Sequence, residues 1–452
     1  GDEVLYINGQ RMKLAGMLFP ESWTLWGDLE HIDGRCGYKV SAAQLPSFAR
    51  PDRLLVDGTK EWAHMICPVA AIHADGRGNM LIEMRQPWFY LVRRKEGIPL
   101  EKPTRLLNAP ELVDEPGEYC YDPDRRVYLL MPPPGVDPLD PATEIRMSGP
   151  GVRLRGIDRL RFEGLVFEYF RSDQSLLDAH IDVQTNFRAR QDNLIERDGT
   201  LASLHNEYER LDGGFVLDGC RDLAFYRCVF RNFDGTALDL TGGCRRITVD
   251  SCLFEQIGGT AVQIGGVAQT DHHPAVPGSN TGDVALVRSE IRASGQFYLG
   301  SVGVFAGYVD HVTIADCTIR DLPYSAIAMG WGWGEEDAGG GTYTIPYRYA
   351  APSPAGANRL EGNLITRVMT RLNDGGGIYL LGCMPGSILQ HNRIESTGPG
   401  MFGGIYLDEG SGYIEVRNNV LRDVPKPFQL NNWRQNRNRT CLFVDNDPPM
   451  EP

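Results

Sequence analysis

The chain has 452 residues, of which 42% are hydrophobic and 23% charged, enough for one large solenoid or two to three ordinary domains. Its 52 Gly and 29 Pro favour a β-rich fold with many turns and disfavour a helical bundle. The net charge of −14 disfavours nucleic acid and anionic membranes as partners and suits a neutral or weakly charged substrate. The sequence has no run of 18 apolar residues, so no membrane-spanning helix is predicted.

The ten cysteines form no CxxC pair and no Cys/His cluster at zinc-ligand spacing, so neither a metal nor another cofactor is predicted. Cys228 and Cys252 are 24 positions apart and occupy the same position of a repeat. Two interpretations stay open: stacked free thiols in a core, or a disulfide between strands about 4.8 Å apart. The chain begins with Gly1 and shows no signal peptide, which we interpret as a processed or trimmed product.

Residues 1–147 show no repeat, and we predict that they form a small all-β module. Residues 4–11 are typical of strand, turn and strand, and residues 116–130 of a hairpin with its turn around residues 123–124. Residues 132–135, Pro-Pro-Pro-Gly, indicate a boundary. We assign residues 148–447 to a second domain that carries the catalytic site.

This second domain repeats. Residues 223–230 align with residues 247–254 at an offset of 24, and Gly-Gly-Ile-Tyr-Leu occurs at residues 376–380 and again 27 positions later. Strand-like segments at such spacing, separated by Gly and Asn, are typical of solenoid coils that bury one shared core. We therefore predict an all-β parallel β-helix of about eight or nine coils.

Asn363, Asn392 and Asn419 each precede a strand-like segment, and we predict that their amides hydrogen-bond from coil to coil. Loop insertions are expected near residues 172–212, 268–282 and 331–358. The first is polar with weak helical character, and long loops in compact domains are often functional. The ends of the stack need caps, which leaves open whether the module, a missing N-terminal segment or association of copies supplies them.

Two carboxylates stand beside the repeated strands. Asp374 precedes three glycines, and Asp408 follows Tyr406 on the face that strand alternation turns outward. Glycosidic bond hydrolysis uses two carboxyl groups on either side of the sugar, and adjacent coils can supply such a pair. Asp374 comes four residues before Ile378 and Asp408 three after Ile405, so the glycines must bend the chain. Alternatively, both aspartates only cap turns.

Several neighbours are candidates for holding a sugar. Trp331 and Trp333 alternate with glycines, and exposed indoles stack on sugar faces; packing under a loop is the alternative. Tyr324, Tyr379 and Tyr406 are expected to line the same groove.

Further polar residues extend this set. Glu409 follows Asp408, while Glu335, Glu336 and Asp337 are either an alternative acid to Asp374 or a plain charged loop. His272 and His273 are open as a metal half-site or a base, but two adjacent histidines usually point apart, and we expect them to be hydrogen-bonding loop residues. Asn431 and residues 432–434, one coil after Asp408, are candidates for holding substrate hydroxyls.

Residues 322–334, 373–379 and 404–410 resemble bacterial right-handed parallel β-helix glycosidases, most closely glycoside hydrolase family 141, whose activities include α-L-fucosidase and xylanase. Residues 4–9 and 116–119 resemble the β module inserted early in such proteins. The resemblance implies a right-handed, single-stranded β-helix in which Asp374 and Asp408 are the catalytic pair.

Residues 404–410 also resemble the β-xylosidases of family 120, which implies that Asp408 is the nucleophile. The second carboxylate of that family would fall near Asn431, which is not acidic, so Asp374 is preferred. Members of this group begin with β-helix strands ahead of the segment like residues 5–9. The resemblance therefore implies that the first coils are missing here or are supplied by a separate chain.

These observations predict a secreted or periplasmic glycoside hydrolase that cleaves a plant or microbial polysaccharide or oligosaccharide. One alternative is a polysaccharide lyase or epimerase on the same fold, which needs a base and usually a cation site. The other is a non-catalytic carbohydrate-binding β-helix.

Overall fold

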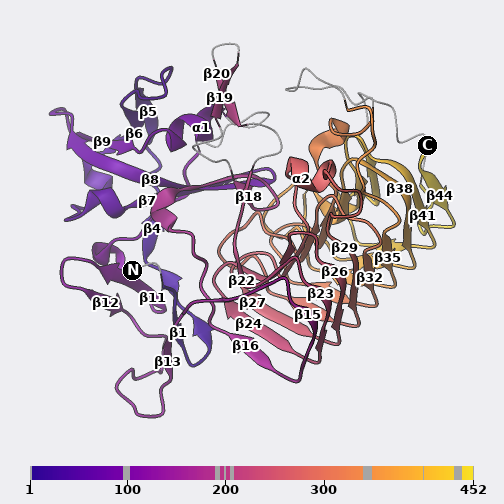
Figure 1. Cartoon of the computed structure of the whole chain (residues 1–452). Helices are drawn as coiled ribbons and strands as arrows, with labels where there is room; N and C mark the ends of the chain where they lie inside the picture. Colours follow the sequence, from indigo (N-terminus) through magenta and orange to yellow (C-terminus); the bar gives the residue numbers. More distant parts are fainter. Residues whose placement is uncertain are drawn as a thin grey trace. The chain divides into compact units, whose positions relative to one another are not determined.

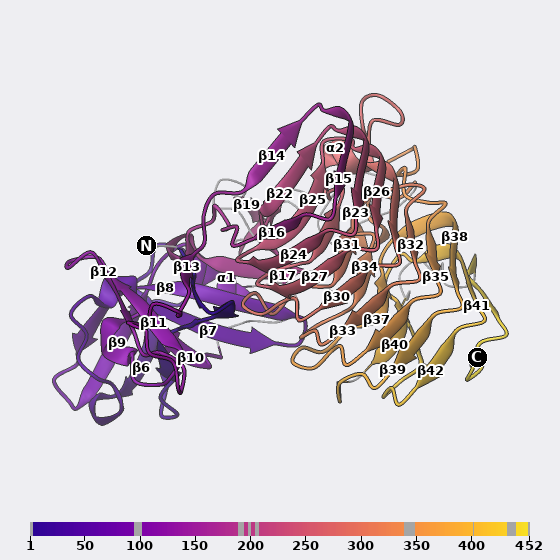
Figure 2. The same cartoon turned by 90° about the horizontal axis from the view of Figure 1, so that it is seen from below.

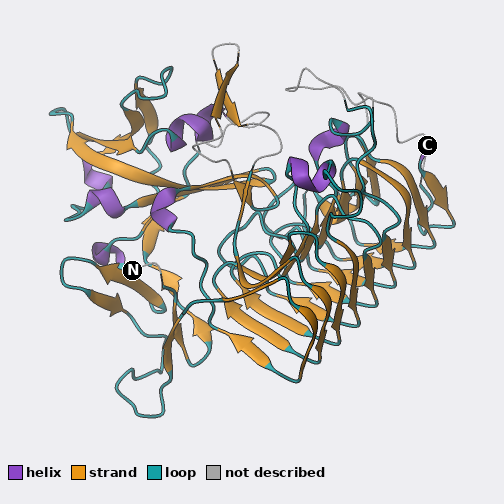
Figure 3. Cartoon of the chain, in the orientation of Figure 1, coloured by secondary structure: helices purple, strands orange, loops and turns teal. Residues whose placement is uncertain are grey.

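The computed structural model describes residues 3–94, 102–188, 194–197, 200–203, 208–338, 349–400, 402–431 and 440–450. Contacts divide the chain into two compact units. Unit 1 comprises Gly1–Gly149, Asp173–Val183 and Arg188–Ser203, and unit 2 comprises Pro150–Ser172, Gln184–Phe187 and Leu204–Pro452. Strands predominate in the described residues, as the orange arrows of Figure 3 show, and the all-β fold class is confirmed.

Unit 1 is built on antiparallel strands. β7 (Leu55–Lys60) pairs with β8 (Ala63–Ala74), β8 with β9 (Asn79–Met84), and β9 with β6 (Cys36–Ser41). Helix α1 (Trp88–Arg94) contributes buried aromatic and aliphatic side chains to the core that these strands enclose. The other strands before residue 149 are β1 Leu5–Ile7, β2 Gln10–Arg11, β3 Lys13–Leu14, β4 Gly16–Leu18, β5 Thr24–Gly27, β10 Arg105–Leu107, β11 Glu118–Asp122, β12 Val127–Leu130 and β13 Ile145–Met147.

The predicted hairpin at residues 116–130 is confirmed, because β11 and β12 pair antiparallel. The weak helical character expected for residues 172–212 is limited, among the described residues of this segment, to a 3-10 turn at Leu176–Asp178, and strands predominate. β-branched residues alternate with polar ones in β17 (His180–Gln184), which pairs antiparallel with β8. This segment also contains β18 Phe187–Arg188, β19 Leu194–Arg197, β20 Thr200–Ser203 and β21 Glu209–Arg210.

Unit 2 is a right-handed parallel β-helix of three long sheets, whose strands stack in successive coils in Figures 1 and 2. Sheet 1 contains β14 Val152–Arg155, β22 Gly213–Asp218, β25 Thr236–Thr241, β28 Val262–Ile264, β31 Val304–Ala306, β34 Ile327–Met329, β37 Gly376–Leu380, β40 Gly403–Leu407 and β43 Phe428–Leu430. Sheet 2 contains β15 Asp158–Glu163, β23 Arg221–Tyr226, β26 Arg245–Asp250, β29 Gly282–Val287, β32 Thr313–Ala315, β35 Arg359–Glu361, β38 Cys383–Gln390, β41 Gly412–Arg417 and β44 Leu442–Val444. Sheet 3 contains β16 Val166–Glu168, β24 Val229–Phe233, β27 Leu253–Ile257, β30 Glu290–Arg292, β33 Thr318–Arg320, β36 Leu364–Thr366, β39 Arg393–Glu395 and β42 Val420–Arg422.

The predicted coil register is confirmed. Leu223 lies opposite Ile247, as the 24-residue offset requires. The two Gly-Gly-Ile-Tyr-Leu segments are β37 and β40, and Ile378 lies opposite Ile405. Because like residues stack inside the coils, the core is a continuous column. The rings of Phe230 and Phe254, for example, stack with centroids 4.7 Å apart.

The turn between sheet 2 and sheet 3 carries a ladder of polar side chains. Asn392 donates from Nδ2 to Asn419 Oδ1 at 2.9 Å and to the Leu360 carbonyl at 2.8 Å, and Asn363 donates to Asn392 Oδ1 at 2.9 Å. The structural role predicted for these asparagines is confirmed. Each is buried, so the ladder satisfies amides that water does not reach.

In earlier coils, cysteines occupy this ladder position. All ten cysteines are free thiols, so the open choice between stacked thiols and a disulfide is settled for thiols. Burial raises the pKa of the Cys252 thiol to about 12, which makes it unreactive as a nucleophile.

Candidate active site

The candidate site lies at the edge of sheet 1 where β37, β40 and β43 end. Leu380 and Leu407 pair in register, and the ladder continues beyond them. The Asp408 amide donates to the Leu380 carbonyl at 2.9 Å, and the Asn431 amide donates to the Leu407 carbonyl at 2.9 Å. The backbone of Asp408 is therefore fixed by hydrogen bonds to the neighbouring coil rather than by a free loop.

Three side chains donate hydrogen bonds to the Asp408 carboxylate. Tyr379 donates to Oδ2, Tyr406 donates to Oδ1 at 3.2 Å, and Asn431 Nδ2 donates to Oδ1 at 2.8 Å. Asp408 is only 7% exposed. Burial raises its pKa above the ordinary value, although the hydrogen bonds, that from Tyr379 first, oppose the rise.

The two tyrosines act as donors because they stay protonated. Their rings meet edge to face, with centroids 5.1 Å apart. Burial, and then the charge of Asp408, raise the pKa of both Tyr379 and Tyr406 above the ordinary value. A phenol with a raised pKa holds its proton at neutral pH and donates it in a hydrogen bond.

Gln184 is a site residue that the sequence did not reveal. Its Nε2 donates to the Tyr379 hydroxyl at 2.7 Å, and its side chain is buried. Because the amide occupies the Tyr379 oxygen as a donor, the proton of Tyr379 points toward Asp408. Gln184 lies 195 residues from Tyr379, within the polar segment that we had marked only as a long functional insertion.

Asp374 lies in the turn that enters β37. Its φ of +51° places it in the left-handed region, which Asp tolerates better than most residues, and its carbonyl accepts a hydrogen bond from Tyr324 at 2.9 Å. A Cβ on Gly375 would lie 2.6 Å from Ser325 Oγ, so glycine is required there. The turn is made at Asp374 itself, and the last two glycines, Gly376 and Gly377, already belong to β37.

The carboxylate of Asp374 also affects the pKa values of Tyr379 and Tyr406. Burial and the charge of Asp408 are the two larger causes of the raised pKa of Tyr406, and the charge of Asp374 is the third. The charge of Asp374 also contributes to the raised pKa of Tyr379. Asp374 itself is half-buried. The two aspartates predicted as a pair therefore act electrostatically on the same two phenols.

Three further acids follow Gly334, which packs on the segment just after Asp408. Gly334 packs directly on Gly410, since a Cβ on Gly410 would lie 2.5 Å from the Gly334 Cα. The acids that follow Gly334 are Glu335, Glu336 and Asp337, and they are 2%, 1% and 5% exposed. The interpretation of these residues as a plain charged loop is therefore wrong.

Individual contacts hold this acidic segment in place. Tyr308 donates to Glu336 Oε2 at 2.8 Å, and the Cys383 amide donates to Asp337 Oδ2 at 3.0 Å. Glu409 is 9% exposed, and its carbonyl accepts a hydrogen bond from the Gly382 amide at 3.1 Å.

Two of the other candidates, Trp331 and Tyr324, are buried. Trp331 is 1% exposed and packs against Phe187, with centroids 5.1 Å apart, which favours the alternative of packing over that of stacking on a sugar. Trp333 is half-buried. The three tyrosines expected to line a groove are all buried, Tyr324 at 0%, Tyr379 at 2% and Tyr406 at 3% exposure, and the hydroxyl of Tyr324 donates to the Asp374 carbonyl.

His272, on helix α2 (Gln269–His272), is also fully buried. Burial, together with the neighbouring His273, lowers its pKa to about 3, and its Nδ1 lies 2.6 Å from Nδ1 of His273. The hydrogen-bonding contact expected of His272 is present, but it is made from the last residue of a helix and not from a loop. Residues 432–434 lie outside the described residues.

Within the part of the chain that the structure describes, no three His, Cys, Asp or Glu side chains gather as metal ligands. In the same residues, no helix has the length and apolarity to cross a membrane.

The architecture is shared with a solved structure. A protein described as a glycoside hydrolase superposes with a TM-score of 0.76 at 21% identity, over 99% of this chain and 77% of that one. The chain shares its fold with a glycoside hydrolase. No family model matches the sequence, and no curated protein matches it.

Two other solved structures match less well. The A-module of the Azotobacter vinelandii mannuronan C-5 epimerase AlgE4 gives a TM-score of 0.36 at 13% identity, over 49% of this chain and 52% of that one. A GH136 lacto-N-biosidase from Eubacterium ramulus gives 0.35 at 10% identity, over 49% and 41%. We draw nothing from either.

Proposed function

We propose that the protein is a glycoside hydrolase that cleaves a plant or microbial polysaccharide or oligosaccharide with Asp408 and Asp374. The observation that carries this proposal is the Asp408 carboxylate, which is buried and accepts hydrogen bonds from Tyr379, Tyr406 and Asn431. Such a carboxylate is fixed in one orientation and is negative above its raised pKa. It can attack or polarise the anomeric carbon of a sugar.

Asp374 is proposed to protonate the leaving oxygen. It belongs to the preceding coil, is half-buried, and adds to the electrostatic field at Tyr379 and Tyr406. A general acid of this kind supplies a proton as the glycosidic bond breaks. Buried acids are the reserve candidates for this role: Glu409, which follows Asp408 directly, and Glu335, Glu336 and Asp337, which follow the glycine that packs on Gly410.

The lyase or epimerase alternative has weaker support. Such an enzyme removes a proton from carbon with a base, and the tyrosines beside Asp408 have raised pKa values that keep them protonated. The surrounding carboxylates also repel a uronate, which those enzymes take as substrate. A non-catalytic binding protein would have no need of a buried, oriented carboxylate, whose charge is costly to bury.

The same acidic surroundings favour a neutral sugar as the substrate. We propose a secreted or periplasmic location, because a polysaccharide substrate would be found there.

A screen of aryl glycosides and neutral polysaccharides tests the proposal, with the products followed by NMR. The expected result is a reducing sugar whose first-formed anomer reveals retention or inversion. An unsaturated product absorbing in the near ultraviolet would instead establish a lyase. Binding of a polysaccharide without turnover would establish a non-catalytic protein.

A further inference from the structure

A polar pocket of about 520 Å³ lies in unit 2 where β25 and β28 end. We call it the Arg210 pocket. Its lining includes the polar side chains of Tyr208, Arg210, Thr241, Thr270, Asp271 and Ser279 and the apolar ring of Phe187. Nothing in the proposed hydrolysis at Asp408 uses these residues.

The Arg210 pocket and Asp408 lie on the same edge of sheet 1. Thr241 ends β25, one position after Leu240, and Asp408 comes one position after Leu407 in β40. An unbroken register joins these two leucines through β28, β31, β34 and β37. At about 4.8 Å per strand, the five steps from β25 to β40 span about 24 Å. A ligand that fills both places must therefore be several sugar rings long.

The charges in the Arg210 pocket are not those of an anion site. The guanidinium of Arg210 forms an ion pair with Asp239, which is 2% exposed, and donates to Thr241 Oγ1 at 3.3 Å. Asp271 accepts a hydrogen bond from the Ala268 amide at 3.0 Å. One cation thus faces two carboxylates, so phosphates and uronates are not attracted.

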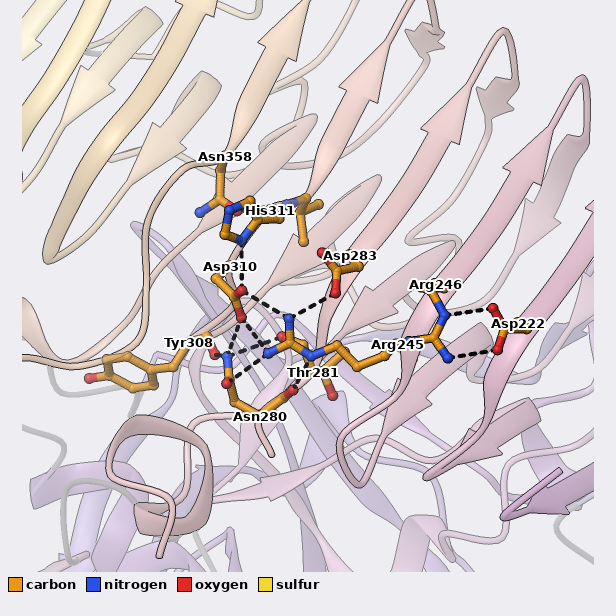
Figure 4. A network of polar contacts seen from close by, with 11 residues as sticks. Asp222, Arg245, Arg246, Asn280, Thr281, Asp283, Tyr308, Asp310, His311 and Asn358 are labelled. Carbon is orange, nitrogen blue, oxygen red and sulfur yellow. Dashed lines mark hydrogen bonds and ion pairs between the residues drawn. The ribbon is translucent and has the colours of Figure 1, made fainter. Parts of the chain in front are cut away.

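A hydrogen-bonded network holds the chain beside one side of the pocket. Asn280, next to the lining residue Ser279, accepts a hydrogen bond at its carbonyl from Arg245 Nε at 3.1 Å. Its Nδ2 donates to Asp310 Oδ1 at 2.7 Å, and Arg245 Nη2 donates to the same oxygen at 2.7 Å. Figure 4 shows this network, in which Arg245 lies between Asn280, Asp283 and Asp310. A preformed wall reduces the entropy lost when a ligand binds.

An aromatic ring completes the pocket. Tyr208 is half-buried, and its ring meets Trp331 edge to face, with centroids 5.8 Å apart. The buried Trp331 therefore holds one edge of Tyr208, whose ring forms part of the pocket lining. Hydroxyls, a carboxylate, a guanidinium and one ring face are the groups that bind sugars through hydrogen bonds and stacking.

We propose that the Arg210 pocket binds one sugar ring of a neutral glycan, distal on the same chain that is cleaved at Asp408. This inference rests on the proposed function, because it takes the chain at Asp408 to be a glycan. It makes the substrate an oligomer or polymer rather than a disaccharide.

Thr270 and Gln269 offer a matched pair for the test. They are adjacent and exposed on α2, and of the two only Thr270 lines the Arg210 pocket. Thr270→Trp places an indole in the pocket, and Gln269→Trp places one beside it. Both are made in the full chain, with and without Asp408→Asn, and Tyr208→Ala is added as a second pocket variant.

Affinity electrophoresis in gels containing arabinoxylan, xyloglucan or glucomannan measures binding without turnover, with polygalacturonate as the anionic comparison. We expect at least one neutral polymer to retard the parent and Gln269→Trp, and that retardation to be lost in Thr270→Trp and Tyr208→Ala. In the active proteins, Thr270→Trp should raise the KM for the polymer about tenfold and leave kcat/KM for an aryl glycoside within about twofold.

Equal retardation of Thr270→Trp and the parent would overturn the inference. So would equal loss in Gln269→Trp, retardation by polygalacturonate alone, or no retardation in any neutral gel. If the expected retardation pattern is found but the wild type cleaves no glycan, the proposed hydrolysis is wrong. The inference that the Arg210 pocket binds a neutral glycan is then still supported.

Discussion

The phenol of Tyr379 donates a hydrogen bond to Oδ2 of Asp408 on the next coil. The sheet itself sets this contact, because Tyr379 lies opposite Tyr406 in the register of β37 and β40, and Asp408 follows two residues later. The repeat that builds the solenoid therefore also assembles the carboxylate and its donors. Substitutions that remove one of these donors should raise the pKa of Asp408 and leave the fold intact.

Tyr379→Phe should move the acidic limb of kcat/KM to higher pH. Among the interactions that lower the pKa of Asp408, the hydrogen bond from Tyr379 is the largest, so its loss raises that pKa further. A hydrogen bond to a charged group contributes about 1.5–3 kcal/mol, so at a fixed acidic pH we expect a loss of about tenfold or more. The pH profiles of Tyr379→Phe and wild type provide the comparison.

Tyr413→Phe serves as the control for that measurement, since Tyr413 is 55% exposed. Its profile should overlay that of the wild type. Overlay of the Tyr379→Phe profile as well would mean that Asp408 is not the group whose ionisation controls activity.

Gln184→Glu should have a larger effect than Gln184→Leu on the same acidic limb. The amide of Gln184 donates to the Tyr379 oxygen and directs the phenolic proton to Asp408. A carboxylate at position 184 competes for that proton, whereas leucine only removes the donor. Profiles that shift equally, or a shift for leucine alone, would contradict this orientation of the hydrogen bond.

Asp408→Asn should increase the melting temperature at neutral pH and have no effect on it at low pH. The pKa of Asp408 is raised in the folded state, so the folded protein binds its proton more tightly than the unfolded chain does. Wild-type stability is therefore favoured below the unfolded pKa and decreases as pH rises through the folded pKa. Calorimetry at several pH values measures the difference, and an Asn variant that is less stable at neutral pH would contradict it.

Asn392→Leu should destabilise the fold by about 3 kcal/mol or more without changing KM. Asn392 is fully buried and is bonded to Asn363, Asn419 and the Leu360 carbonyl, and each buried partner left unsatisfied costs about 1–3 kcal/mol. Denaturant unfolding gives the loss. Asn446→Leu, at the more exposed end of the ladder, should cost less, and equal losses would argue against the ladder.

The fold could be predicted because its signal is repeated. The 24-residue and 27-residue offsets became strand pairs, and Asn363, Asn392 and Asn419 became a ladder. A repeat in the sequence indicates which residues stack on one another, because each coil must bury the same face. The pairing of residues 173–183 with unit 1 had no such signal, because the strand partner of His180 is Ile66, far away in sequence.

The candidate site was predictable only in part. Tyr379, Tyr406 and Asn431 could be associated with Asp408 because they occupy neighbouring coils. Gln184 could not, since its contact depends on how an insertion folds back on the solenoid.

The burial of individual side chains was the other property that could not be predicted from the sequence. Trp331 and Glu336 lie in a glycine-rich segment that is typical of an exposed loop, yet they are buried. Their burial depends on tertiary contacts such as the packing of Gly334 on Gly410. A local sequence pattern does not predict such contacts.

The most direct test is turnover of a cleaved glycan or aryl glycoside by Asp408→Asn and Asp374→Asn. Asp423→Asn is the control, because Asp423 has the same left-handed backbone as Asp374 but is exposed. The account predicts that kcat falls by about 10³-fold or more in each of the first two variants, with circular dichroism unchanged, and that Asp423→Asn keeps full activity. Wild-type turnover by Asp408→Asn would contradict it.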